Sequence, residues 1–386
     1  MARVSAGAVG LVAAGAFAAP ALASDVADLA VEAAGGTIAA DASGKFSKVT
    51  LINRSEDVDA AGILVTLDIS KLDQNKVKFA DKDCGKPENG LVFCGIEGDV
   101  IPAGARVDWL FPLERVAGAT GDAGKITVTI KHDGTDPNPK NDSVTLAVKV
   151  GDSGPDLMIL ADDVDQVVEV NSNGKLQFKG ALKPGDTTSL LYYVANHGDQ
   201  AASGVKITIK LPEGVTFTEV EDDCEYAEDN RSAVCTYENL PLIPADEDKS
   251  DKDEIYSAAG FYNLITVGSD VTAPAKLTGG TVSVEPLVSR ATLNALSATA
   301  PELPKGVEGM SAADVDASDN VDGYTVMVAK AGGGGGGGGT LPVTGAEAGL
   351  IGGIGLAVVV VGGVLFLMAR RRRVVLVTPG DEKSTD

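Results

Sequence analysis

The fold is decided by the stretch VKITIKLPEGVTF, residues 205–217. Lysines and a threonine alternate along it with apolar side chains at Val205, Ile207, Ile209 and Leu211. A period of two predicts a β-strand that buries one face and exposes the other. The Pro212-Glu213-Gly214 segment that follows is typical of a tight turn. This stretch therefore indicates antiparallel strands that are joined by turns.

The same alternation recurs elsewhere in the chain. Apolar residues occupy every second position in 126–130 and 144–150, and in 63–69 apart from Leu64, which breaks the pattern. Turn-forming segments such as 86–90 separate these runs, and no convincing long amphipathic helix interrupts them. Short strands with turns between them predict an all-β chain of antiparallel β-sandwiches of immunoglobulin-like kind.

The two halves of the chain repeat one pattern. Each half contains an asparagine, two cysteines, an Ile-Pro dipeptide and a similar closing segment, in that order. These are Asn53 and Asn196, Cys84/Cys94 and Cys224/Cys235, Ile101-Pro102 and Ile243-Pro244, and 136–150 and 314–329. One building block used twice accounts for this order. We expect one sandwich over 24–150 and a second over 156–330, joined by a short linker at 151–155.

The second half has a more specific pattern. It contains Asn196-His197-Gly198, then a strand end and turn from Leu211 to Phe217, then Cys224 and Cys235. This pattern resembles the Ig-like repeats that are common in bacterial surface proteins. The first half departs from it, because residues 67–72 replace the Leu-Pro-x-Gly turn. Such repeats are mostly spacers and adhesive stalks, so the resemblance implies a location and an architecture more than a ligand.

The C-terminal segment combines a short motif, an apolar run and a basic stop. The motif at 341–345 is Leu341-Pro342-Val343-Thr344-Gly345. Residues 349–369 carry no charge and would span roughly 31 Å as a transmembrane helix, close to the hydrocarbon thickness of a bilayer. The cytoplasmic tail at 370–386 begins with the basic residues that should stop export, which are Arg370, Arg371, Arg372 and Arg373.

This combination resembles the LPxTG cell-wall sorting signal of Gram-positive surface proteins. The resemblance implies that a sortase cysteine attacks the carbonyl between Thr344 and Gly345, and that an amine of the peptidoglycan resolves the acyl-enzyme. Sortase and peptidoglycan are then the expected partners, and the helix holds the precursor in the membrane before processing. A plain single-pass anchor is the alternative. The tail after Arg373 is longer than the family usually shows.

The N-terminus has the pattern of a secretory signal peptide over residues 1–23. Arg3 precedes an apolar stretch, and the small residues that end it predict cleavage between Ala23 and Ser24. At the other end, a glycine-rich linker at 331–340 precedes the sorting motif. We therefore expect a secreted protein that is attached to the peptidoglycan of the cell wall.

Charge and cysteine content narrow the function further. The net charge of −23 argues against nucleic acid as a partner and against binding to an anionic bilayer by charge.

Four cysteines in a secreted protein are expected to form disulfides, with three connectivities open. Local pairing, Cys84 with Cys94 and Cys224 with Cys235, is favoured because each pair brackets a turn-rich segment. Metal ligation is the alternative, although no C-x-x-C spacing supports it.

The sequence predicts no catalytic, cofactor-binding or metal site. Residues 314–320 place carboxylates and amides at alternate positions, as calcium loops do, but lack the glycine and glutamate of an EF-hand. We expect a solvated loop there, with calcium as the alternative. The histidines, His132 and His197, occupy non-equivalent contexts, and no G-x-S-x-G nucleophile motif occurs. An enzyme is therefore not expected.

Two hypotheses of function remain. The first is a sortase-anchored surface protein whose sandwiches act as a structural or adhesive module. The second is a receptor that binds a peptide, a glycan or calcium through loops such as 246–254. Either could have an extracellular protein or glycan as a ligand, and the sequence does not identify it.

Overall fold

The computed structural model describes residues 26–80, 84–95, 100–170, 175–248, 256–287 and 314–330. The segments expected to be a signal peptide with its cleavage site, a glycine-rich linker, a sorting motif, a transmembrane helix and a basic tail lie outside these residues. Within the described part, no helix has the length and apolar character needed to cross a membrane. The described chain is all-β apart from one 3-10 turn, Ala245–Glu247.

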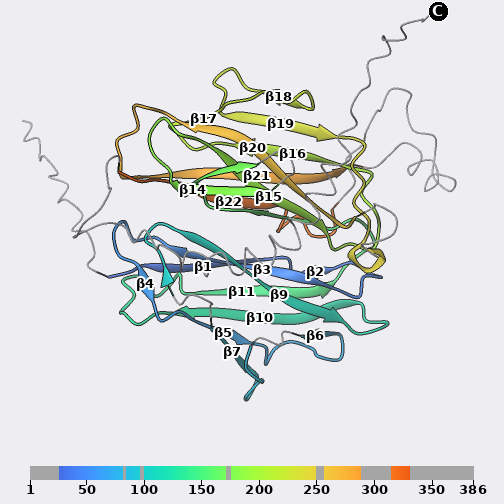
Figure 1. Cartoon of the computed structure of the whole chain (residues 1–386). Helices are drawn as coiled ribbons and strands as arrows, with labels where there is room; N and C mark the ends of the chain where they lie inside the picture. The colour runs from blue at the N-terminus through green and yellow to red at the C-terminus, as the bar shows by residue number, and fades with distance from the viewer. Residues whose placement is uncertain are drawn as a thin grey trace, which may run out of the picture.

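The first sandwich consists of two antiparallel sheets, the second of which also has one short parallel strand. One sheet has the order β1-β3-β9-β6, and the other has the order β2-β11-β10-β5-β7 (Figure 1). A two-residue pair, β4 with β8, closes one end. The strands are β1 (Leu29–Ala34), β2 (Thr37–Ile38), β3 (Gly44–Asn53), β4 (Ala60–Ala61), β5 (Leu64–Asp68), β6 (Val77–Phe79), β7 (Leu91–Gly95), β8 (Val100–Ile101), β9 (Arg106–Arg115), β10 (Gly121–Lys131) and β11 (Ser143–Val150).

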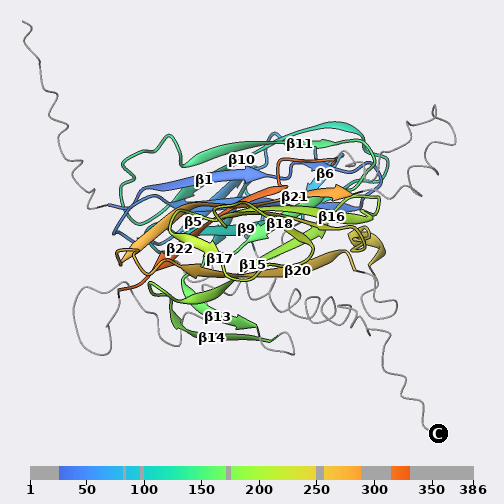
Figure 2. The same ribbon diagram turned by 90° about the horizontal axis from the view of Figure 1, so that it is seen from above.

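The second sandwich lies above the first in Figure 1 and has sheets of order β12-β15-β20-β17 and β18-β19-β16-β21-β22. A separate hairpin, β13 with β14, projects from its side (Figure 2). The strands are β12 (Leu157–Ala161), β13 (Gln166–Val170), β14 (Leu176–Ala181), β15 (Thr187–Asn196), β16 (Gly204–Lys210), β17 (Val215–Phe217), β18 (Cys224–Tyr226), β19 (Ser232–Tyr237), β20 (Ala258–Val267), β21 (Ala275–Leu287) and β22 (Val321–Val328).

The repeat is visible in the topology. The order β1-β3-β9-β6 corresponds to β12-β15-β20-β17, and β11-β10-β5-β7 corresponds to β22-β21-β16-β19. Asn53 and Asn196 are both buried and hold the same connection, because each side-chain amide donates to two backbone carbonyls. One acceptor is the carbonyl of Ile101 in the first sandwich and that of Leu242 in the second. The structural match to Ile101 is thus Leu242, one residue before the Ile243 that the sequence alignment indicates.

Each sandwich has its own apolar core between its two sheets. The alternating residues of 205–209 point into the second core and are fully buried. In the first core, Val65 and Leu67 are fully buried, whereas Leu64 is 38% exposed on the outer side of β5. The position that breaks the alternation is therefore an outward-facing position occupied by an apolar side chain.

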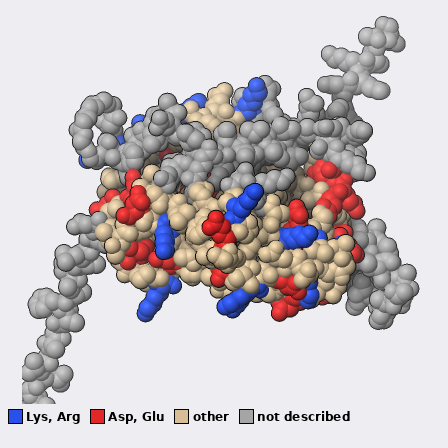
Figure 3. Space-filling model, turned by 90° about the horizontal axis from the view of Figure 1, so that it is seen from below, with Lys and Arg blue, Asp and Glu red and all other residues tan. Residues whose placement is uncertain are grey.

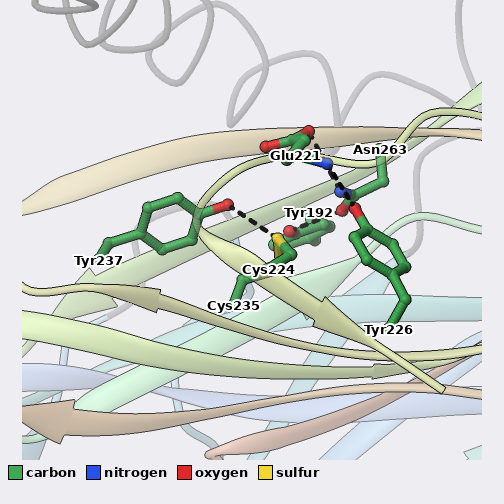
Figure 4. The surroundings of a disulfide bond; sticks show 7 residues. All are labelled: Tyr192, Glu221, Cys224, Tyr226, Cys235, Tyr237 and Asn263. Carbon is green, nitrogen blue, oxygen red and sulfur yellow. Dashed lines mark hydrogen bonds between the residues drawn. A yellow bond between two sulfur atoms is a disulfide. The ribbon is translucent and has the colours of Figure 1, made fainter.

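Both disulfides join residues close in sequence, Cys84 with Cys94 and Cys224 with Cys235. Cys224 and Cys235 face each other in the register of β18 and β19. Figure 4 shows the second disulfide beneath tyrosines, with the Tyr237 hydroxyl 4.0 Å from the Cys224 sulfur. Behind it, the Tyr192 hydroxyl donates to Asn263 at 2.9 Å. Each disulfide therefore fastens a sheet edge, and the second also supports an aromatic cluster.

Reduction of the disulfides should lower the stability of both sandwiches. Closing loops of 10 and 11 residues removes unfolded-state entropy worth about 2.5–3 kcal/mol each in the loop-closure model. Chemical denaturation with and without a thiol reductant measures the difference. Equal unfolding midpoints in the two conditions would contradict this assignment.

Candidate functional site

The most distinctive site is a set of charged side chains buried between the two sandwiches, which we call the junction. The basic residues of the junction, Lys45 and Lys48, both come from strand β3. Alternation along β3 turns Val49 and Leu51 into the first core, which leaves Lys48 on the opposite face, toward the second sandwich. Both lysine side chains are almost completely buried. Buried lysines require partners, and the second sandwich provides them.

Lys45 is surrounded by carboxylates of the second sandwich. Its Nζ donates to both oxygens of Asp156, at 3.0 and 2.8 Å. It also lies 3.0 Å from Asp319 Oδ2 and 3.7 Å from Asp316 Oδ2. The side chains of Lys45, Asp156 and Asp319 are all 0% exposed. The Asp316 carboxylate also accepts a hydrogen bond from the backbone N–H of Thr37 at 2.6 Å, which ties the same loop to the first sandwich.

Lys48 forms a second contact further along β3. Its Nζ lies 2.9 Å from Asp322 Oδ1 and donates to the backbone carbonyls of Ile159 and Val321. All three donors of the ammonium group are therefore used. The other Asp322 oxygen accepts from the Ala161 N–H at 2.8 Å. This arrangement holds the ends of β12 and β22 against β3.

Further hydrogen bonds extend the junction in both directions. The backbone N–H of Arg106 donates to Asp163 Oδ2 at 2.8 Å, and the backbone N–H of Ser43 donates to Asp246 Oδ2 at 2.6 Å. At the far end, Lys276 of the second sandwich donates to the backbone carbonyl of Glu56 in the first. The two sandwiches are thus joined along a face, in addition to the linker at 151–155.

Burial controls the ionisation of the Lys45 cluster. Burial alone would lower the pKa of Lys45, but the carboxylates of Asp319, Asp156 and Asp316 outweigh it and raise that pKa. Burial raises the pKa of Asp156 to about 8 and that of Asp319 to about 6, against the opposing effect of the Lys45 ammonium. Lys45 is therefore an ammonium ion. Asp156 and Asp319 retain protons above the ordinary range of a carboxyl, whereas the Lys45 charge and hydrogen bonds outweigh burial at Asp316 and lower its pKa.

The carboxyls around Lys48 show the same effect. Burial, followed by the neighbouring Asp322 carboxylate, raises the pKa of Asp108 well above its ordinary value. Burial also raises the pKa values of Asp162 and Asp163 to about 7. The junction therefore contains more carboxyl groups than its basic side chains can balance.

The first sandwich has a loop equivalent to the acidic loop of the second, and comparing the two shows which residues are specific to the junction. Leu29 N–H donates to Asp136 as Leu157 N–H donates to Asp314, so Asp28 corresponds to Asp156. By the same register, Asn138 and Asn141 correspond to Asp316 and Asp319. In the first sandwich the Asn141 amide donates directly to Asp28 at 3.0 Å. Two amides there take the place of two carboxylates, and Asn141 provides for Asp28 the hydrogen bond that Lys45 provides for Asp156.

The structure changes the interpretation of two segments. Residues 314–320 were expected to be a solvated loop or a calcium loop, but Asp316 and Asp319 are buried at the junction. Among the described residues, no group of acidic, histidine or cysteine side chains has the arrangement to hold a metal ion. His197 is also buried, with its ring 5.8 Å from the Phe46 ring. Burial, followed by the nearby Lys45 charge, lowers its pKa to about 3.

The two lysines of β3 are the functional residues that sequence reasoning missed. Their partners are distant in sequence, with Asp156 111 residues from Lys45. The sequence feature that could have indicated them is the pair of lysines among the apolar residues of segment 44–53. The register of Asn53 with Asn196 places Thr188 and Leu191 at the corresponding positions of the second sandwich. The lysines are thus specific to the first sandwich.

Two hollows accompany these features. A crevice of about 250 Å³ opens beside Lys48, lined in part by Glu32, Arg106 and Val321. A more open hollow of about 510 Å³ lies along β18 and β19, lined by Asp222, Asp223 and other polar residues. On the face of the first sandwich seen in Figure 3, basic side chains stand apart and larger acidic groups lie toward both ends.

Comparison with known proteins adds little to this description. No protein-family model matches the sequence, and no curated protein matches it. Among solved structures, the third cohesin of ScaC from Acetivibrio cellulolyticus, solved in complex with the ScaB dockerin, is similar at 13% identity. The match covers 38% of this chain and 92% of the cohesin, with a TM-score of 0.22. At this level the likeness assigns neither a ligand nor a partner to this chain.

Replacing Lys45 with methionine should destabilise the protein by about 3–5 kcal/mol, because it leaves buried carboxylates without their counter-ion. Chemical denaturation of the full chain measures the loss. Lys125→Met on the exposed side of β10 is the matched control, expected to change stability by less than about 0.5 kcal/mol. Equal stability of the two variants would contradict the assigned role of Lys45.

Proposed function

We propose that this chain is a secreted surface protein that sortase attaches to peptidoglycan, and that its paired sandwiches act as a structural or adhesive module. The observation that carries the proposal is the buried junction, which makes a stiff unit of two repeats. The sorting motif Leu341–Gly345 and the signal peptide supply the location. A stiff unit on a flexible glycine linker suits a domain that must stand clear of the wall.

Stiffness follows from the junction rather than from the linker. Five residues at 151–155 would leave two separate domains free to change their orientation. The ion pairs of Lys45 and Lys48 and the hydrogen bonds of Thr37, Ser43 and Arg106 fix that orientation at several separated points. A load applied at one end of the module is then transmitted through the joined faces. This property suits a spacer or a stalk.

A receptor is the second candidate function. The hollow along β18 and β19 is lined by Asp222, Asp223, Glu225 and Glu238, with Lys206 beside them. Such a surface would attract a cationic peptide more than a neutral glycan. Saturable binding of a lysine-rich peptide, lost in Asp222→Asn with Asp223→Asn, would favour the receptor over the spacer. An enzyme is not proposed, since the sequence offers no activated nucleophile.

The sorting motif can be tested independently of the sandwiches. Thr344→Ala should leave the protein in the membrane fraction, because the acyl-enzyme forms at the carbonyl of Thr344. Val343→Ala, at the variable position of the motif, is the matched control and should remain linked to the wall. Cell fractionation followed by digestion of the wall measures both variants. Wall linkage of Thr344→Ala at the level of the control would contradict attachment by sortase.

A further inference from the structure

The junction is unbalanced in charge. Around Lys45 lie Asp156, Asp316 and Asp319, and Asp314 is close enough to affect the pKa of Asp156. One ammonium group therefore faces four carboxyl groups. Removing an ion from water costs several kcal/mol, and a buried charge without a partner is usually neutralised instead. The surplus carboxyls must therefore lose their charge when the sandwiches close.

Protons are the neutralising species that the geometry supports. No group of residues in the described ranges is arranged to hold a metal ion. Oδ1 of Asp319 has no hydrogen-bond partner in the described structure, and Oδ2 has only its ion pair with Lys45, at 3.0 Å. An added proton on such a carboxyl removes the surplus charge and requires no additional ligand. A proton on Asp108 would remove surplus charge in the same way. The Asp108 carboxyl lies beside Asp322 and accepts a hydrogen bond from the Thr50 hydroxyl.

We propose that the junction is a proton-dependent latch, which holds the two sandwiches together while its surplus carboxyls are protonated and loosens when they lose those protons. The closed latch is the arrangement of the structure. Loosening separates the faces but leaves each sandwich folded, because each has its own core.

The other charged groups that face the latch come from several elements. The first sandwich contributes Lys45 and Lys48 from β3, Arg106 and Asp108 from β9, and Glu32 from β1. The second contributes His197, which burial keeps neutral, and Tyr193, whose pKa burial and Asp162 raise. Its acidic groups are Asp156, Asp162, Asp163, Asp314, Asp316, Asp319 and Asp322. Outside β3 and β9, the positive group at the junction is Lys276 of β21, which lies at the far end beside Glu56, Asp57 and Asp59 of the first sandwich.

The sign of the pH dependence follows from linkage. A carboxyl whose pKa is raised on closing binds more protons in the closed state, so the closed state loses stability as pH rises. With the faces apart, water reaches these carboxyls and their pKa values return toward the ordinary value of about 4. Asp156, at about 8 in the closed junction, and Asp163, at about 7, then place this loss between about pH 4 and pH 8. Asp316 acts in the opposite sense, because Lys45 and hydrogen bonds outweigh burial and lower its pKa. His197 also opposes it, since its lowered pKa costs stability as pH falls below about 6.5. The latch should therefore be tightest in mildly acidic solution.

The first sandwich suggests the substitution that would remove this dependence. Asn141 stands where Asp319 stands in the second sandwich, and its amide donates to Asp28 without a lysine. Asp319→Asn keeps the size of the side chain and fixes it in an uncharged form. Asp156→Asn does the same for the other buried partner of Lys45. Either variant should hold the junction closed over a wider pH range.

Amide hydrogen exchange of the full chain tests the latch directly. The N–H groups of Thr37 and Arg106 donate across the junction to Asp316 and Asp163. Their protection factors, corrected for the intrinsic pH dependence of exchange, should fall between pH 6 and pH 8.5. The expected loss is about tenfold per pH unit for each proton released. The amide of Val49, in the core of β3, should keep its protection and so report that the first sandwich stays folded.

Substituted proteins and added calcium distinguish proton release from other causes of a change in protection. Asp319→Asn or Asp156→Asn should reduce the pH dependence at Thr37 and Arg106, whereas Asp222→Asn, beside β18 on the far side of the second sandwich (Figure 1), should leave it unchanged. Constant protection of the unsubstituted chain from pH 6 to pH 8.5 would overturn the proposal. So would restoration of protection at pH 8.5 by calcium, because a divalent cation would then be the neutralising species.

Discussion

The ammonium group of Lys45, buried among carboxylates of the second sandwich, is the interaction on which the arrangement of the two sandwiches depends. It lies 2.8 Å from Asp156 and 3.0 Å from Asp319, and none of these side chains contacts solvent. An ion pair in such a place is costly to form and more costly to break, because a lone charge would remain buried. It therefore favours one docked orientation over the many that an apolar contact would tolerate.

The two repeats show how one fold serves two positions in a chain. Their strand orders match, and Asn53 and Asn196 make the same hydrogen bonds. They differ at the junction, where the first sandwich has lysines on β3 and the second has carboxylates on the loop before β22. The first sandwich cannot use its own loop in the same way, since Asn141 already donates to Asp28. The buried ion pairs are therefore directional, with lysines from the first sandwich and carboxylates from the second.

Local patterns predict most of the fold, because strands and turns depend on neighbouring residues. The alternation in 205–211 predicts β16, and the turn-rich segments between cysteines predict the two short-range disulfides. The junction could not be predicted in this way. The position of Lys48 among the apolar residues of 44–53 does not indicate its partner, because Asp322 is far along the chain. The loop at 314–320 shows the same difficulty, because its alternating acids suit calcium and an ammonium ion equally well.

The central claim, that the two sandwiches move as one body, is tested most directly by nitrogen-15 relaxation of the backbone amides near pH 6. Amides of β3 and of β15 should fit a single rotational diffusion tensor, since the junction fixes both sandwiches in one frame. Two tensors with shorter correlation times, one for each sandwich, would contradict the account and leave the linker at 151–155 as the main connection between them.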